Sequence, residues 1–415
     1  MQSVLTAIFS FSGGYNYPNR QVCREFRFLI RAREDAYLYY LNDLCRDYPR
    51  ELTKYIGSFT SSVDIAKLAL DKGLFYLLTR FREHVPSDVA NIAALKGNLD
   101  ILSWSKEQGY DPEDTCFSSA IEGGHLHVLQ WLDDNDYYAY DDLFIVAAEV
   151  GNVEILQWLD DNSYGRIAIE DCICNYAAEK GHIQVLEWCL EREWMWNEST
   201  SSYAIEGGQL ETLKWLKEKG YFTEDPERWS SDLCSEAAKY GKLEILKWLR
   251  EKECPWNANT CSEAALYNKF ELLQWARANG CSWDEWTCSS ASEGGNLEIL
   301  QWCREKGCPW DERTCTNAAW AGHLEILQWA RSANCPWDAR VCSNAAQAGH
   351  LEVLQWARAN GCPWDNRVTF YTVYSDRLDI LKWAIDNGCE WHPRAMREAE
   401  GQEVIEWMKA NGCPE

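Results

Sequence analysis

The chain has no long apolar segment and no export signal. No apolar run approaches the roughly 20 residues that a membrane-spanning helix needs. The opening residues, MQSVLTAIFSFSGG, lack the basic lead and the small-residue cleavage site of a secretory signal. We therefore expect a soluble protein of the cytoplasm, with the nucleus as the alternative, and no membrane partner.

Basic residues are also scarce. Lys and Arg number 40 against 65 Asp and Glu, which gives a formal net charge of −25. Binding of DNA or RNA phosphates needs a basic face, so nucleic acid is not expected as a partner. The acidic charge favours a basic partner or serves to keep a long open surface in solution. The 19 cysteines, in a chain without an export signal, are expected to be reduced thiols.

Motifs that carry chemistry are missing as well. The sequence shows no glycine-rich phosphate loop, no closely spaced set of metal ligands and no nucleophile elbow. The prediction is therefore a protein that is not an enzyme and holds neither a cofactor nor a metal.

Tryptophan is abundant, with 23 residues, and it marks an internal repeat. The first Trp column advances in steps of 27, 27, 30, 27, 33, 27, 27, 27, 27, 27 and 24 residues. A second column follows eight residues after members of the first, and the two columns together hold 19 of the 23 Trp. The first column is Trp104, Trp131, Trp158, Trp188, Trp215, Trp248, Trp275, Trp302, Trp329, Trp356, Trp383 and Trp407; the second is Trp196, Trp256, Trp283, Trp310, Trp337, Trp364 and Trp391. Such a period indicates a solenoid, in which most of these Trp pack between units.

One unit, Asp338 to Asp365, predicts two helices joined by a tight turn. Asp338 can cap the first helix, and Gly349 ends it in a conformation that favours glycine. The second helix, LEVLQWARAN, carries its apolar residues on one side. Its predicted buried stripe is Leu351, Val353, Leu354, Trp356 and Ala357, with Glu352, Gln355 and Arg358 pointing outward.

The predicted fold class is all-α, a helical-hairpin solenoid with a short helical N-terminal segment. Residues 1–58 do not fit the repeat, and residues 59–415 form about 12 units in a right-handed superhelical stack. The last units degrade into a cap, where Asp376 replaces the turn glycine and Thr372 and Val373 replace an Ala pair. A monomer is expected.

The units resemble ankyrin repeats. Thr314-Cys315-Thr316-Asn317-Ala318-Ala319, followed by Gly322-His323-Leu324-Glu325-Ile326-Leu327, is similar to the ankyrin pattern TPLHxAAxxGHxEVV. Most units have 27 residues instead of 33, and so lack part of the protruding hairpin. This short variant, with its Gly-Cys-Pro-Trp-Asp loop, resembles arrays common in large DNA viruses of protists and in oomycete or algal genomes. The resemblance implies a protein-binding scaffold, and a viral source would imply a host protein as its target.

Two sets of residues invite other interpretations. Cysteines recur seven residues apart, as in Cys254 and Cys261, a wider spacing than in most zinc sites. They fall in the Ala and Leu columns of the pattern, so small buried side chains are the preferred interpretation over zinc or disulfides. The histidines after the turn glycine have no nucleophile or carboxylate in register and are expected to be structural. They are His125, His182, His323 and His350.

The first helices are expected to line the concave surface, where ankyrin families bind. Two residues before each turn glycine, the exposed position is acidic in four consecutive units, and aromatic residues lie near it. Such a surface suits a protein partner with a basic, partly apolar segment, although a solvated acidic face is an equal alternative. The candidate binding residues are Glu122, Glu149, Glu179, Glu206, Tyr176, Tyr203, Tyr240, Tyr267 and Trp320.

Two further segments stand outside the regular pattern. An insertion at residues 222–229 restores a 33-residue period, and its Trp229 is a candidate contact if the insertion protrudes. The N-terminal segment resembles an F-box, the module that docks on the Skp adaptor of cullin ubiquitin ligases. The residues that carry this resemblance are Leu5, Ile8, Phe9, Val22, Cys23 and Phe26. A helical cap on the first repeat is the alternative for this segment.

Overall fold

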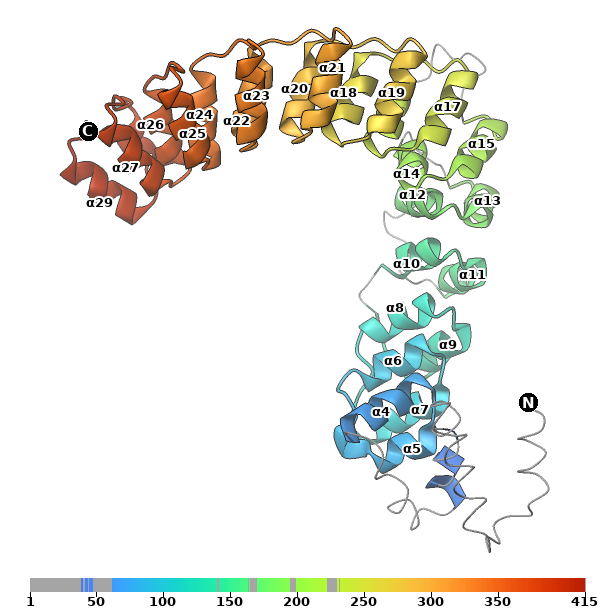
Figure 1. The fold of residues 1–415 in the computed structure, drawn as a ribbon. Coiled ribbons are helices and arrows are strands. Elements are labelled where there is room, and N and C mark those ends of the chain that lie inside the picture. The colour runs from blue at the N-terminus through green and yellow to red at the C-terminus, as the bar shows by residue number, and fades with distance from the viewer. Residues whose placement is uncertain are drawn as a thin grey trace, which may run out of the picture. The chain divides into compact units, whose positions relative to one another are not determined.

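The computed structural model describes residues 62–414 except 140–141, 163, 165–169, 195–198, 222–229 and 231, and also residues 39, 42, 43 and 45–47. The described residues contain 27 helices and no strand (Figure 1). The all-α class predicted from the sequence is therefore confirmed for this part of the chain. The chain divides into two compact units, residues 1–169 and 170–415. The sequence pattern did not predict that division.

The described part of the first unit contains four helical hairpins. They are α4 (Ser62–Asp71) with α5 (Phe75–Arg80) and the short η3 (Arg82–His84), α6 (Val89–Leu95) with α7 (Leu99–Glu107), α8 (Thr115–Glu122) with α9 (Leu126–Asp134), and α10 (Leu143–Val150) with α11 (Val153–Asp161).

The second unit continues the same alternation. Its hairpins are α12 (Glu170–Lys180) with α13 (Ile183–Glu191), α14 (Ser199–Gly207) with α15 (Leu210–Glu218), α16 (Asp232–Lys239) with α17 (Leu243–Glu251), α18 (Ala258–Leu266) with α19 (Phe270–Ala278), α20 (Glu285–Glu293) with α21 (Leu297–Glu305), α22 (Glu312–Trp320) with α23 (Leu324–Ser332), α24 (Arg340–Ala348) with α25 (Leu351–Ala359), α26 (Arg367–Tyr374) with α27 (Leu378–Asp386), and α28 (Ala395–Glu398) with α29 (Gln402–Ala410).

Each unit is built as two layers of helices. The first helix of each hairpin packs against the first helix of the next, for example α18 against α20 and α20 against α22. It also packs against its own second helix, as α22 does against α23. In the second unit the helices accordingly follow one another pair by pair (Figure 1).

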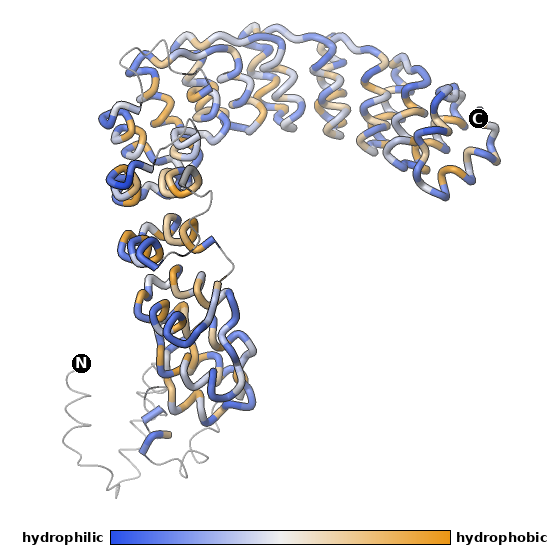
Figure 2. Tube along the Cα trace, turned by 180° about the vertical axis from the view of Figure 1, so that it is seen from behind, coloured by the Kyte–Doolittle hydropathy of each residue, from blue (hydrophilic) through white to orange (hydrophobic). Residues whose placement is uncertain are grey.

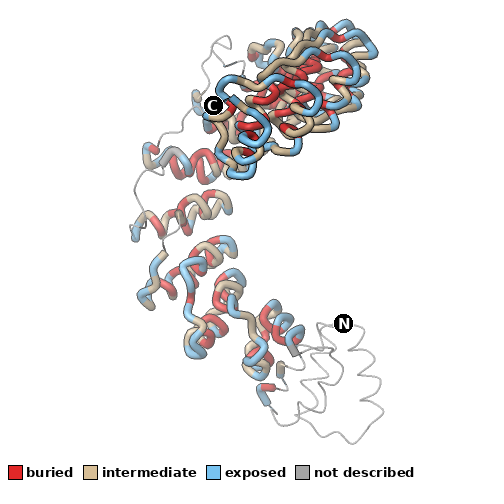
Figure 3. Tube along the Cα trace, turned by 90° about the vertical axis from the view of Figure 1, so that its left-hand side faces the viewer, coloured by how far each residue is buried: buried red, intermediate tan, exposed pale blue. Residues whose placement is uncertain are grey.

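Small residues allow the first helices to approach closely. Ala318 and Ala319 of α22 and the equivalent Ala345 and Ala346 of α24 are fully buried. The second helices bury a wider stripe, such as Ile326, Leu327 and Ala330 of α23. Hydrophobic and hydrophilic residues alternate along each hairpin (Figure 2), and most of the buried residues lie within the helices (Figure 3). No hairpin encloses a core of its own, so each is stabilised by its neighbours.

The turn between the two helices is also a contact between repeats. Gly322 has φ +79°, a region that favours glycine, and a Cβ there would lie 2.6 Å from the ring of His350 in the next repeat. Likewise, a ring nitrogen of His323 lies 3.2 Å from the carbonyl oxygen of Glu293 at the end of α20. These contacts confirm the structural interpretation of the two histidines.

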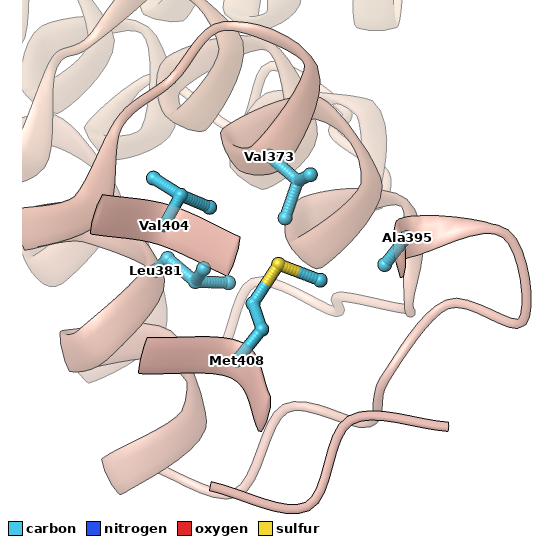
Figure 4. Packing of buried hydrophobic residues seen from close by; sticks show 5 residues of the cluster. All are labelled: Val373, Leu381, Ala395, Val404 and Met408. Atoms are coloured by element: carbon cyan, nitrogen blue, oxygen red, sulfur yellow. The ribbon is translucent and has the colours of Figure 1, made fainter. Parts of the chain in front are cut away.

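The last hairpin closes the second unit. Met408 and Val404 of α29 pack with Leu381, Val373 and Ala395 (Figure 4). The other side of α29 is polar and exposed, with Gln402, Glu403, Glu406 and Lys409. Because Asp376 adopts φ +53°, it does occupy the turn position of glycine. The last hairpin thus has one apolar, packed side and one polar side, and its role as a cap stays a prediction.

Candidate partner-binding surface

Most Trp side chains form a seam between repeats. A second-column Trp of one repeat meets a first-column Trp of the next at ring-centroid distances of 5.8 to 6.1 Å. We call these pairs the Trp seam: Trp256–Trp275, Trp283–Trp302, Trp310–Trp329, Trp337–Trp356, Trp364–Trp383 and Trp391–Trp407. Five of the six meet edge to face, at 65° to 76°, which suits the charge distribution of aromatic rings. The Trp excess thus serves packing between repeats, as the repeat pattern predicted.

In five of the loops that follow second helices, an arginine contacts both the loop backbone and a Trp ring of the seam. Arg331 lies 4.2 Å from the ring centroid of Trp337, and its Nη1 donates a hydrogen bond to the carbonyl oxygen of Cys335. Arg358 makes the same two contacts with Trp364 and Cys362. The prediction that Arg358 points outward is therefore wrong. A cation over an indole ring adds attraction to the packing of its aliphatic stem.

Most of the described cysteines lie in the interior, and the thiols that meet are not those seven residues apart. The thiol of Cys281, in the loop after α19, meets that of Cys261 in α18, which is 20 residues earlier. The loop thiols also donate to backbone oxygens of the preceding loop, as Cys308 Sγ does to Asp284 at 3.4 Å. The hydrogen bond with Cys281 and burial both raise the pKa of Cys261. Both thiols are fully buried, as predicted for small interior side chains.

The remaining accessible surface of the first helices carries the predicted binding residues. Glu122 is exposed at the end of α8, and Glu149 is partly exposed near the end of α10. Both belong to the first unit. In the second unit Glu179 and Glu206 occupy the same position at the ends of α12 and α14. Glu179 forms an ion pair of 2.8 Å with Lys180, and Glu206 is exposed.

Tyrosines lie beside these carboxylates in the second unit. Tyr176 of α12 and Tyr203 of α14 have ring centroids 6.0 Å apart. Tyr240 and Tyr267 directly follow α16 and α18, and Lys239 lies 4.8 and 5.8 Å from their ring centroids. The ammonium of Lys239, the one cation in this row, thus lies against two tyrosine rings, while Glu206 stays exposed.

Trp320 ends α22 and is 43% exposed. Its ring stacks on no other aromatic ring or cation among the described residues. Trp229 and the F-box-like residues, which run from Leu5 to Phe26, lie outside the described residues, so their roles stay predictions.

A second row of accessible residues continues from Tyr176 and Tyr203, and its other members were not predicted from the sequence. It lies three residues before the first row, and side chains three apart share one side of a helix. Glu236 is in this row, and its Oε1 accepts a hydrogen bond of 2.9 Å from the Ser202 hydroxyl. Burial raises the pKa of Glu236 and also that of Glu263, the equivalent residue of α18. The spacing alone would have identified this row.

We call the two rows together the first-helix face. In the second unit it comprises Tyr176, Tyr203, Glu236, Glu263, Ser290, Asn317, Asn344 and Tyr371 in one row, and Glu179, Glu206, Lys239, Leu266, Glu293, Trp320, Gln347 and Tyr374 in the other. None of these residues is buried.

The described residues offer no other recognisable site. No group of three or more His, Cys, Asp or Glu side chains among them is arranged to hold a metal. No helix in the described ranges has both the length and the apolar character for a membrane span.

No protein-family model matches the chain, and no curated protein matches it. Solved structures of helical repeat proteins are among those that match it. One is the human ASB11 ankyrin repeat domain, with 15% identity and a TM-score of 0.34 over 44% of this chain and 98% of that one. Another is the maize pentatricopeptide repeat protein PPR10, with 12% identity and a TM-score of 0.28 over 100% of this chain and 79% of that one. The chain's own stacked helix pairs identify it as a helical repeat protein.

Proposed function

We propose that the chain is a non-enzymatic scaffold of ankyrin type that holds a partner protein on its first-helix face. The observation that carries this proposal is the contrast within each first helix. The pair of positions that is Ala-Ala in most first helices is buried against neighbours, whereas the positions beside it are accessible and in most units carry Glu, Tyr or Trp. Aromatic side chains at accessible positions are typical of binding surfaces.

The charge of the face indicates the chemistry of the partner. From α12 to α18 the face has four carboxylates, Glu179, Glu206, Glu236 and Glu263, against one ammonium, that of Lys239. With the ammonium of Lys180, which pairs with Glu179, four negative and two positive charges leave −2. A partner segment rich in Lys or Arg meets an attractive field here, and it can stack its cations on tyrosine rings.

The test compares two sets of charge reversals with the same change in net charge. The first replaces Glu122, Glu149, Glu179 and Glu206 by Lys. The control replaces Glu271, Glu298, Glu325 and Glu352, which are exposed at the starts of second helices. Affinity capture from the native cell, with quantitative mass spectrometry, should lose the partners with the first set and keep them with the control. Equal capture by both variants would exclude the first-helix face.

A second candidate function rests on the F-box-like motif between Leu5 and Phe26. In this case the repeats select a substrate, and the N-terminal segment docks on the Skp adaptor of a ubiquitin ligase. Co-expression with a Skp adaptor tests it directly. The adaptor should co-purify with the full chain and be lost when residues 1–50 are deleted, and no co-purification would reject this function.

A further inference from the structure

The first-helix face of the second unit changes its chemistry along the stack. From α12 to α18 it is the acidic half, which comprises Tyr176, Glu179, Tyr203, Glu206, Glu236, Lys239, Glu263 and Leu266. From α20 to α26 it is the amide–aromatic half, which comprises Ser290, Glu293, Asn317, Trp320, Asn344, Gln347, Tyr371 and Tyr374. The only carboxylate of the second half, that of Glu293, accepts a hydrogen bond of 3.0 Å from Asn317.

The amide–aromatic half offers hydrogen-bonding groups that the fold does not use. The side-chain amides of Asn344 and Gln347 bond to no other described residue. Each amide presents both donors and an acceptor, the combination that a polypeptide backbone requires. Accessible side chains of this type recognise an extended peptide regardless of its charge.

Exposed rings flank these amides on both sides. Trp320 is 43% exposed on α22, and Tyr374 is 63% exposed on α26. Tyr374 stacks on Phe370 at a centroid distance of 6.4 Å, which orders its ring. Ordered Tyr and Trp beside adaptable amides make up the composition of protein-binding paratopes, where the rings bury apolar side chains at a low entropy cost.

The two halves belong to one continuous row of helices. Successive first helices from α12 to α26 pack against one another, including α18 against α20, where the chemistry changes. A single extended segment that follows the row therefore passes from the acidic half to the amide–aromatic half.

We infer that the partner segment is bipartite: Lys or Arg side chains cross α12–α18, and an uncharged stretch with apolar side chains crosses α20–α26. This inference rests on the proposed function and adds the order of the two chemistries. It also predicts two kinds of binding energy on one surface. Contacts with the acidic half weaken as salt rises, whereas contacts with Trp320 and Tyr374 do not.

The experiment uses a phage-displayed library of random 24-residue peptides selected on the full chain. We expect the enriched peptides to carry basic residues in one part and apolar, uncharged residues in the other. Selection on E179Q/E206Q/E263Q should lose the basic part, and selection on W320A/Q347A/Y374A should lose the apolar part. For the best peptide, each triple variant should weaken binding at least tenfold, and raising salt should weaken it only through the acidic half.

A control variant, E298Q/E325Q/E352Q, removes the same charge as the first variant from second helices and should leave the selected peptides unchanged. Enriched peptides with no segregation of basic and apolar residues would overturn the bipartite inference and leave the proposed function standing. No enrichment on the wild-type chain would contradict both. Melting temperatures of all variants verify that each is folded.

Discussion

The Trp seam and the first-helix face follow opposite rules within the same repeats. At the seam, identical contacts recur every 27 residues, with Trp on Trp and Arg over Trp from one repeat to the next. On the face, the equivalent position holds Glu206, then Lys239, Leu266, Glu293 and Trp320. Uniform contacts are what stacking requires, because each interface contributes to the stability of its neighbours. A surface whose side chains change along the stack instead presents a particular pattern to a particular partner.

The largest expected effect comes from breaking a seam pair. Trp329→Ala removes the ring that meets Trp310 and should lower the stability of its repeats by about 3 kcal/mol. Trp320→Ala, nine residues earlier on the face, should change stability by less than about 0.5 kcal/mol. Urea unfolding followed by fluorescence and circular dichroism measures both. Equal losses would remove the distinction between seam and face.

Two turn glycines allow the cost of an unfavourable backbone conformation to be measured apart from the cost of a clash with the next repeat. Both Gly322 and Gly307 have positive φ, so alanine at either site should cost about 1 kcal/mol. At Gly322 the new Cβ would also clash with the ring of His350, whereas at Gly307 it would meet no atom within 4 Å. Gly322→Ala should therefore lower the melting temperature clearly more than Gly307→Ala. If the two variants melt together, the histidine contact contributes nothing to stacking.

The arginine of the seam should contribute less than the rings. Arg331→Met keeps an apolar stem of similar length but loses the cation over Trp337 and the hydrogen bond to Cys335. We expect a loss of about 1 to 2 kcal/mol in unfolding free energy. The control is Arg313→Met. Arg313, at the start of α22, lies over the ring of Trp286 in α20, which is exposed and outside the seam. A control that loses as much as Arg331→Met would contradict a special role for the seam arginines.

The smallest expected effect is the contribution of Glu236 to the pH dependence of stability. Whether stability rises or falls with pH follows from which state binds the proton more tightly. Burial raises its folded pKa above the ordinary value of 4.5, with Glu206 and Asp232 adding to the rise and Ser202 and Lys239 opposing it. The folded state therefore holds the proton more tightly, and stability falls as pH rises from about 4.5 through the folded pKa. Glu236→Gln should remove that slope and raise the melting temperature slightly at pH 7. Parallel melting curves of the two proteins against pH would refute this account of Glu236.

The helix boundaries that recur in every unit could be predicted from the sequence. Asp338 accepts a hydrogen bond from the backbone N–H of Arg340, and Gly349 ends α24 with φ +90°, both as the pattern predicted. These features depend on local geometry, which a single repeat contains.

Contacts between segments distant in the chain were not predictable in the same way. Arg358 looked like an outward residue because the helical pattern contains no information about the loop that places Trp364 over it. The cysteines recur seven residues apart in the sequence, but the thiols that the hairpin brings together are 20 residues apart. On the face, the first row was identified because most of its residues stand two places before a turn glycine. The second row, with Glu236 and Asn344, has no such marker.

The Trp seam stabilises the stack of repeats, and the first-helix face binds the partner. One variant tests this most directly: E179Q/E206Q/W320A/Q347A/Y374A, measured for urea unfolding and for binding of the selected peptide or captured partner. We predict an unfolding midpoint close to that of the wild type, together with loss of binding by at least a hundredfold. A midpoint lowered as far as by Trp329→Ala, or binding that survives all five substitutions, would contradict the claim.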